Sequence, residues 1–178
     1  QYDVAKAKAE MAKSKYPKGF KVQILTGAGA QVEQSIGQIV QQQLTQLGII
    51  ATFKQEDTST EFNDINAFKY QLAFSYWTMD IADPDELVTF ALDPQGGAFS
   101  FYTHYNNPTV TKLSHQAQRE VNVPKRAKLY SQIQRIAAAD ANLGYLYYSP
   151  YRWAYTSKLH GFYVEPLGNY RLENAWLG

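Results

Sequence analysis

Hydrophobic positions follow two spacings along this chain, and each spacing predicts a different element. Val32, Ile36 and Val40 recur every four residues, which predicts an amphipathic helix that ends near Gly48. Polar and apolar residues alternate over residues 21–25, which predicts a strand. Further helices are expected at 4–14, from Ser59 or Thr60 to 68, after Asp83, after Asn107 and from Val123, and further strands at 49–54, 71–76, 143–148, 151–155 and 161–164.

The order of these elements predicts the class of fold. Strand, helix and strand follow one another over residues 21–54, an order that favours a parallel pair joined by a right-handed crossover. We expect an α/β fold with one mixed sheet of about four to six strands, flanked by helices, and a short β-rich C-terminal end. Because no repeat or linker interrupts the pattern, residues 1–178 are expected to form a single domain.

Composition narrows the classes of protein. Apolar residues make up 45% of the 178 residues and charged residues 19%, as in ordinary globular proteins. The net charge is +1 and the basic residues are spread along the sequence, which argues against nucleic acid as a partner. The absence of cysteine excludes disulfides and thiolate metal sites. The start Gln1-Tyr2-Asp3 lacks the features of a signal peptide, so we expect a mature product or an excised fragment.

Several motifs of cofactor and metal sites are incomplete. Gly27-Ala28-Gly29 lies between a strand and a helix, but it lacks the third glycine and the lysine of the nucleotide-binding loops, so it is interpreted as a turn. The three histidines, His104, His115 and His160, lack the spacing of metal ligands. No Gly-x-Ser-x-Gly sequence is present for a hydrolase elbow. We therefore expect no cofactor and no metal ion.

One short acidic run, Asp80, Asp83 and Asp85, contains the candidate chemistry. Asp83 is expected to cap a helix that begins at Pro84, and Asp85 to lie near the positive end of its dipole. Asp80 has no such structural assignment, and it follows a strand end beside Trp77. A carboxylate there suits a cationic or ammonium-bearing ligand. A solvated loop aspartate and a pair of catalytic carboxylates, as in glycoside hydrolases, remain alternatives.

The same segment carries a resemblance to a known family. Residues Tyr76-Trp77-Thr78-Met79-Asp80, followed by Asp83-Pro84-Asp85, resemble the W-x-x-D-x-x-D-P-D segment of the family 5 extracellular solute-binding proteins. These are the peptide- and nickel-binding receptors of ABC importers. Five other segments agree with the family in order and spacing: Y-D-V-A-K-A at 2–7, Q-Q-L-T-Q-L-G-I at 42–49, Y-N-N-P at 105–108, R-A-K-L-Y with Gln134 from 126, and the end from Gly161 to Tyr170.

This resemblance implies a function as well as a fold. It implies the C-terminal lobe of a two-lobed, periplasmic-binding-protein type II-like receptor whose N-terminal lobe is absent from this chain. Such a receptor is a binding protein rather than an enzyme. It holds a solute, foremost an oligopeptide and alternatively a nickel complex or a sugar, and delivers it to an ABC permease. The expected location is extracytoplasmic, in a periplasm or on a cell-surface lipoprotein.

The resemblance also implies which side chains contact the solute. The family pattern places the ligand's ammonium group on Asp80 and a side chain of the ligand against Trp77. Tyr76, Thr78 and Met79 are expected to complete the ligand-binding surface. No catalytic residue is expected, and a glycoside hydrolase that uses two of Asp80, Asp83 and Asp85 is the competing hypothesis.

Overall fold

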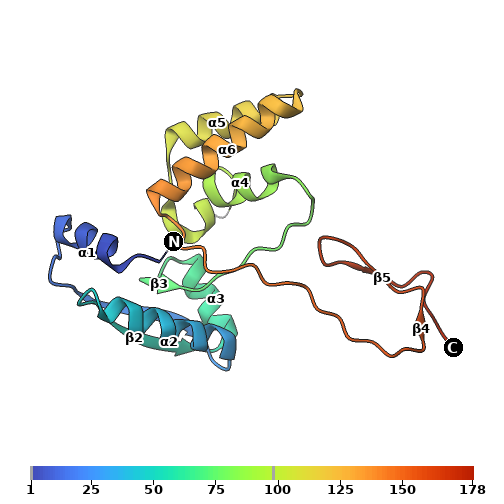
Figure 1. Ribbon diagram of the computed structural model, residues 1–178, viewed down its shortest axis with the longest axis horizontal. Coiled ribbons are helices and arrows are strands. Elements are labelled where there is room, and N and C mark those ends of the chain that lie inside the picture. The colour runs from blue at the N-terminus through green and yellow to red at the C-terminus, as the bar shows by residue number, and fades with distance from the viewer. Residues whose placement is uncertain (1, 98) are drawn as a thin grey trace. The chain divides into compact units, whose positions relative to one another are not determined.

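The computed structural model describes residues 2–97 and 99–178 and divides the chain into two compact units (Figure 1). Unit 1 is Gln1–Tyr76 and unit 2 is Trp77–Gly178. The helices are α1 (Val4–Lys13), α2 (Gln31–Thr45), α3 (Thr58–Asn66), α4 (Pro84–Leu92), α5 (Pro108–Arg119) and α6 (Val123–Asp140), with an irregular turn η1 (Ser100–His104). The strands are β1 (Lys21–Gly27), β2 (Ile50–Glu56), β3 (Leu72–Ala73), β4 (Leu159–His160), β5 (Tyr163–Val164), β6 (Tyr170–Arg171) and β7 (Trp176–Leu177).

Unit 1 is built on a parallel sheet in the order β2-β1-β3. β1 and β2 pair along their whole length, from Lys21 opposite Ile50 to Gly27 opposite Glu56, with α2 as the connection between them. This confirms the predicted parallel β-α-β unit. β1 buries alternate residues in its first half and every residue in its second half. Its buried apolar side chains contribute to a core that packs against α2.

Glycine inside α2 is explained by packing rather than by flexibility. Gly37 is the buried residue of this helix, and a Cβ there would lie 2.6 Å from Cε1 of Phe53 on β2. The ring therefore occupies the volume of the missing side chain, and the helix approaches the sheet closely. Gly48 follows the helix with φ of 77°, the left-handed conformation expected of a residue that ends a helix.

Helix starts in the structure agree with the side chains that the sequence offers. The Asp3 carboxylate accepts the Lys6 N–H at 2.9 Å, and Asp57 accepts the N–H groups of Ser59 and Thr60 at 3.1 Å. The expected start of α3 at Ser59 or Thr60 was therefore wrong by one or two residues. Asp57 is the cap, and its carboxylate also accepts the hydroxyl groups of Ser59 and Thr60, the residues at which we expected the helix to begin.

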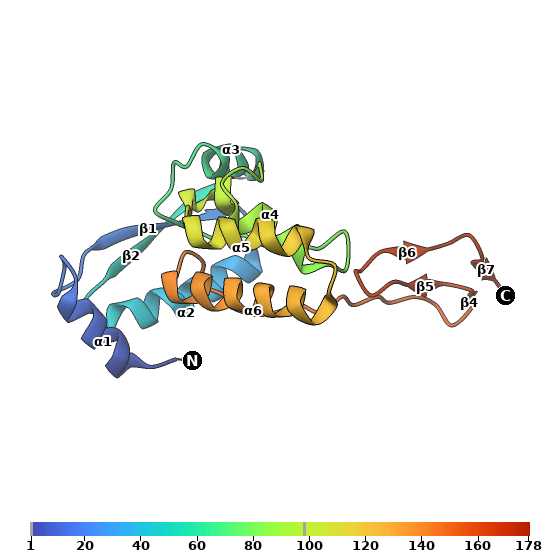
Figure 2. The same cartoon turned by 90° about the horizontal axis from the view of Figure 1, so that it is seen from above.

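Unit 2 begins with a bundle of three helices. α5 and α6 lie side by side (Figure 2), and α4 packs against α5. Their shared core includes Val110, Ala117 and Ile133, each with an exposed fraction of 0%. The predicted starts at Asp83 and Asn107 are confirmed, because both side chains accept N–H groups of the first helical turn.

The C-terminal end of unit 2 differs from the prediction. Residues 143–148 and 151–155 form no strand in the described part of the chain, although both are rich in the aromatic residues that strands favour. Two antiparallel pairs follow, β4 with β7 and β5 with β6, each two residues long. The α/β class is confirmed. The single mixed sheet of four to six strands was wrong, since the sheet of unit 1 is wholly parallel with three strands and the antiparallel pairs do not join it.

The division into units leaves the domain assignment untested. Each unit has a hydrophobic cluster of its own, one on the sheet of unit 1 and one among α4, α5 and α6 of unit 2. The assignment of residues 1–178 to a single domain stays a prediction. In the described residues no helix combines the length and the apolar character needed to cross a membrane.

Candidate functional site

The candidate segment Tyr76 to Asp80 follows β3 as a loop, and α4 begins four residues after it. Tyr76 ends unit 1 with an exposed fraction of 81%, and Thr78 and Asp80 are exposed as well. Trp77 and Met79 are half-buried. The loop therefore alternates between exposed and half-buried side chains.

The backbone at Asp80 is held by the first turn of α4. Glu86 accepts the Asp80 N–H at 2.9 Å through Oε1 and the Ile81 N–H at 2.8 Å through Oε2. Glu86 is the third residue of α4, where a glutamate often reaches back to the residue that caps its helix. Here it reaches further back. The sequence analysis did not predict this role of Glu86, although its place three residues after Asp83 was the signal for it.

Two of the three aspartates in the acidic run are engaged in structural contacts. Asp83 accepts the Asp85 N–H and forms a two-pronged ion pair with the Arg126 guanidinium, with both N–O distances 2.8 Å. The Arg126 guanidinium holds the pKa of the Asp83 carboxyl below its usual range. Asp85 accepts the Tyr130 hydroxyl at 3.0 Å, and burial together with this bond raises the pKa of Tyr130 to about 12.

These contacts join the start of α4 to α6. Arg126 also donates to the Tyr130 hydroxyl at 3.1 Å and to the Ala117 carbonyl at 3.1 Å, so one side chain connects all three helices of the bundle. The assignment of Asp83 and Asp85 to the helix start agrees with this geometry. Their partners Arg126 and Tyr130 were not predicted, although both belong to the R-A-K-L-Y segment that contributed to the family resemblance.

Asp80 is the carboxylate of the run that stays free. Within residues 2–97 and 99–178 its side chain has no hydrogen-bond or ion-pair partner, and it is exposed. A glycoside hydrolase needs a second carboxylate for acid–base work. Since Asp83 and Asp85 are engaged by Arg126 and Tyr130, the arrangement favours binding of a positive group over hydrolysis.

Trp77 is packed more tightly than the sequence suggested. Its ring stacks on Phe90 with centroids 3.9 Å apart and meets the edge of Phe101 at 6.3 Å. The aromatic side chains of unit 2 thus cover one face of the indole. The indole N–H is buried and has no hydrogen-bond partner in the part of the chain that the structure describes. Contact between Trp77 and a ligand stays a prediction.

The glycine loop after β1 suits a turn rather than a phosphate. A Cβ at Gly27 would lie 2.6 Å from the Glu61 carboxylate, so this carboxylate lies directly against the loop. Burial raises the pKa of Glu61, and the nearby carboxylates of Glu33 and Glu56 raise it further. Three acidic groups close to the loop repel a phosphate. Among the described residues, no group of three acidic or histidine side chains has the arrangement of a metal site.

An open groove lies elsewhere in unit 2. The α5–α6 groove has a volume of about 1160 Å³ and runs between Lys112–Arg119 of α5 and Lys125–Gln132 of α6. None of the residues of the candidate segment lines it. It contains basic side chains that look dispersed in the sequence but that the fold brings together, so the sequence did not predict this groove.

Comparison with known proteins identifies the family. A family model described as bacterial extracellular solute-binding proteins, family 5 middle, matches residues 1–99. A probable D,D-dipeptide-binding periplasmic protein of Escherichia coli is 30% identical over 138 residues, 75% of this chain and 26% of that protein. The oligopeptide-binding protein OppA of Bacillus subtilis is 24% identical over 130 residues, 73% of this chain and 24% of that protein. The chain thus spans about a quarter of the length of these two relatives.

Solved structures agree with this result. The ABC transporter-associated periplasmic binding protein DppA of Helicobacter pylori, in complex with the peptide STSA, has a TM-score of 0.68 and 25% identity over 80% of this chain and 28% of its own. The oligopeptide-binding protein AppA of Bacillus subtilis, in complex with a nonapeptide, has a TM-score of 0.80 over 100% of this chain and 38% of its own. At 22% identity the second likeness shows the fold alone.

Both the family and its location are therefore confirmed. These relatives are binding proteins of the periplasm or of the cell exterior, and the expected extracytoplasmic location agrees with them. The match to the family model covers more than half of the chain, including the loop from Tyr76 to Asp80. The chain belongs to family 5 of the bacterial extracellular solute-binding proteins.

Proposed function

We propose that this chain is part of a receptor for peptides, in which the Asp80 carboxylate binds the ammonium group at the start of the ligand. The observation that carries the proposal is the free, exposed carboxylate of Asp80 on a backbone that Glu86 holds in place. A hydrogen bond to a charged group contributes about 1.5–3 kcal/mol. Asp80 can therefore supply a substantial part of the affinity and set the direction of the peptide.

The neighbouring side chains supply the rest of the proposed surface. Tyr76 and Thr78 are exposed, and Met79 presents part of a flexible thioether that adapts to different ligand side chains. Trp77 stacks on Phe90, so the ligand would contact only the remaining surface of the indole. Such a surface combines one fixed charge with adaptable apolar groups, which suits peptides of varied sequence.

The relatives support a peptide as the solute and an importer as the destination. Their names describe binding of a D,D-dipeptide, of oligopeptides and of glutathione, and one of them is described as associated with an ABC transporter. We extend these descriptions to this chain as proposals. They include delivery to an ABC permease and closure of a second, N-terminal lobe over the ligand.

The test uses the full-length receptor and the substitution Asp80→Asn, which keeps the shape of the side chain and removes its charge. A mixed pool of tetrapeptides with free amino ends is equilibrated with the protein by dialysis, and bound peptide is measured by mass spectrometry. The same pool with acetylated amino ends is measured in parallel. We expect Asp80→Asn to weaken binding of the free-amino pool by about 10-fold to 150-fold and to leave the acetylated pool unchanged.

A matched control is available on α1. Glu10→Gln also removes one carboxylate, but Glu10 lies on the surface of α1 beside Lys13. It should leave binding of both pools unchanged. Equal loss of both pools in Asp80→Asn would contradict recognition of the ammonium group, and unchanged binding of the free-amino pool would contradict the role of Asp80.

A further inference from the structure

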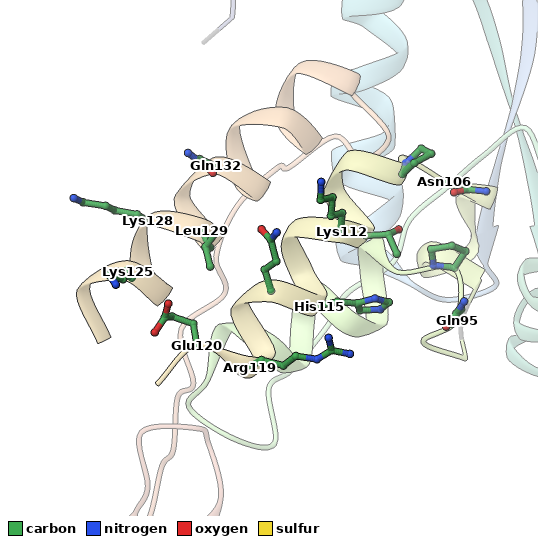
Figure 3. A pocket seen from close by; sticks show the side chains of 14 residues that line it. Gln95, Asn106, Lys112, His115, Arg119, Glu120, Lys125, Lys128, Leu129 and Gln132 are labelled. Carbon is green, nitrogen blue, oxygen red and sulfur yellow. The ribbon is translucent and has the colours of Figure 1, made fainter. Parts of the chain in front are cut away.

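The α5–α6 groove gathers positive charge from two helices. Lys112 and Arg119 are two turns apart on α5, and Lys125 and Lys128 are one turn apart on α6. Residues that differ by three, four or seven positions lie on the same face of a helix. Because α5 and α6 pack side by side, all four side chains line one groove, with Lys128 extending outward from its α6 edge and Arg119 outward from its α5 edge (Figure 3).

These cations are not explained by contacts within the protein. In residues 2–97 and 99–178 none of the four forms an ion pair. Lys125 lies in the first turn of α6, where the helix dipole disfavours a positive charge. Lys125 and Lys128 also repel each other at a spacing of three residues. The arrangement slightly destabilises the free protein, and a negatively charged partner would reverse that effect.

The opposite charge within the groove is small. Among its described lining residues Glu120 is the one carboxylate, and its side chain accepts the N–H of Asn122 at 2.8 Å. His115 lies on the wall, where its ring nitrogen contacts the buried Asp93 carboxylate at 2.8 Å. The exposed charge of the groove is therefore positive.

The other side chains of the groove suit a polypeptide. Gln116 and Gln132 line it and offer amide groups that can donate to and accept from a peptide backbone. Leu129 adds a half-buried apolar surface to the lining. A volume of about 1160 Å³ exceeds that of most small-molecule pockets, which hold about 300–1,000 Å³, and is enough for several residues of an extended chain.

We propose that the α5–α6 groove is a docking site for an acidic, extended segment of a partner protein. Its cations would pair with aspartate or glutamate side chains of that segment, and its glutamines would contact the backbone. A flat anionic membrane fits the groove less well, because the amide and apolar groups lie within the hollow between the helices. None of the residues from Tyr76 to Asp80 lines the groove, so the proposal stands independently of peptide recognition.

The test uses the full-length receptor and a labelled dodecapeptide that alternates aspartate and alanine. Both of its ends are blocked, so that it offers no ammonium group to Asp80. Fluorescence anisotropy measures its binding to the wild-type protein and to the double variant Lys125→Glu, Lys128→Glu. We expect the double variant to bind the peptide at least about tenfold more weakly than the wild-type protein does, because two attractive contacts become repulsive. Raising the salt from about 0.1 M to about 1 M shortens the screening length from about 10 Å to about 3 Å and should also weaken binding.

A matched control separates the groove from general electrostatics. The double variant Lys6→Glu, Lys8→Glu changes the net charge equally on the exposed surface of α1. It should bind the acidic peptide as the wild-type protein does, and the asparagine version of the peptide should not bind. Equal weakening in both double variants would overturn the proposal. The proposal would also be overturned if the protein failed to bind the peptide but bound phosphatidylglycerol vesicles in a way that depends on Lys125 and Lys128.

Discussion

The helical part of unit 2, residues 77–142, and its C-terminal part, residues 143–178, are both rich in aromatic rings but bury them differently. In the helical part Phe101 and Tyr130 have exposed fractions of 9% and 3%. In the C-terminal part no residue is buried, and Tyr148 is 99% exposed. A high content of aromatic residues therefore does not by itself produce a core. The three packed helices bury their aromatic rings, whereas the two short antiparallel ladders leave theirs exposed.

Local contacts explain how far the C-terminal part is ordered. Its rings meet one another, as Trp153 does with Tyr170 at 5.0 Å and His160 with Trp176 at 4.3 Å. Its two ladders are two residue pairs each, and an isolated two-stranded hairpin is marginal in water. We expect the free energy of local opening to be high in α4–α6 and low in residues 143–178.

The largest effect is expected from a core substitution in the helical part. Ile133→Ala removes three carbon atoms from a side chain with an exposed fraction of 0% and should reduce the free energy of unfolding by about 2–5 kcal/mol. Urea denaturation of this 178-residue chain can follow the helical part alone if Trp153 and Trp176 are replaced by phenylalanine. Fluorescence then reports on Trp77, which stacks on Phe90 in the helical core.

The matched substitution in the C-terminal part is Leu177→Ala. Leu177 is 72% exposed, so its truncation should change the same transition by less than about 0.5 kcal/mol. If both substitutions cost equally, the C-terminal part is as strongly packed as the helices, and the comparison fails.

A smaller loss is expected from Arg126→Met. This change removes the ion pair with Asp83 and the hydrogen bonds to Tyr130 and to the Ala117 carbonyl, while it keeps much of the side-chain volume. The pair is partly exposed, which reduces its value, so we expect a loss of about 1–2 kcal/mol in urea denaturation. Arg135→Met is the control on the exposed face of α6, and a similar loss there would contradict a special role of Arg126.

Acid should remove the contribution of this ion pair. The pKa of Asp83 is lowered in the folded protein, so its contribution is complete above the unfolded value of about 3.9 and is lost as the pH falls through the folded value. The difference in stability between the wild-type protein and Arg126→Met should therefore be constant near pH 7 and shrink below about pH 4. A difference that stays constant down to pH 2 would show that the charge of Asp83 does not contribute.

The smallest effect on stability is expected from Asp80→Asn. Although Asp80 belongs to the same part as the buried helices, its side chain is exposed and its contacts with Glu86 use only the backbone. The substitution should change the free energy of unfolding by less than about 0.5 kcal/mol. A larger loss of stability would show that the Asp80 side chain contributes to the fold. A loss of peptide binding in Asp80→Asn could then no longer be attributed to a contact between Asp80 and the ligand.

Elements that depend on local chemistry were predicted well from the sequence. The helices expected from residue 4, after Asp83 and after Asn107 begin there, capped by Asp3, Asp83 and Asn107, because a cap needs only a polar side chain and the next turn of the same chain. The parallel pairing of β1 with β2 followed from the helix between them. The family segment from Tyr76 to Asp80 identified the candidate site, and the structure then showed which of its neighbours are engaged elsewhere.

Features that depend on distant parts of the chain were not predicted. The strands expected at 143–148 and 151–155 have the aromatic composition of strands, but a strand also needs a partner, which the composition of one segment does not specify. The burial of Trp77 depends on Phe90 and Phe101, and the role of Asp83 depends on Arg126, 43 residues away. The positive groove was missed for the same reason, since its cations become neighbours only when α5 packs against α6.

The hydrogen bonds from Glu86 have a consequence for the entropy of binding. A loop that must be ordered by its ligand loses conformational freedom at the moment of binding, at a cost of about 1–2 kcal/mol for each residue whose backbone is fixed. Glu86 orders the backbone at Asp80 and Ile81 when the protein folds. A ligand that arrives at Asp80 therefore meets a carboxylate on a backbone already in position, and more of its interaction free energy remains as affinity.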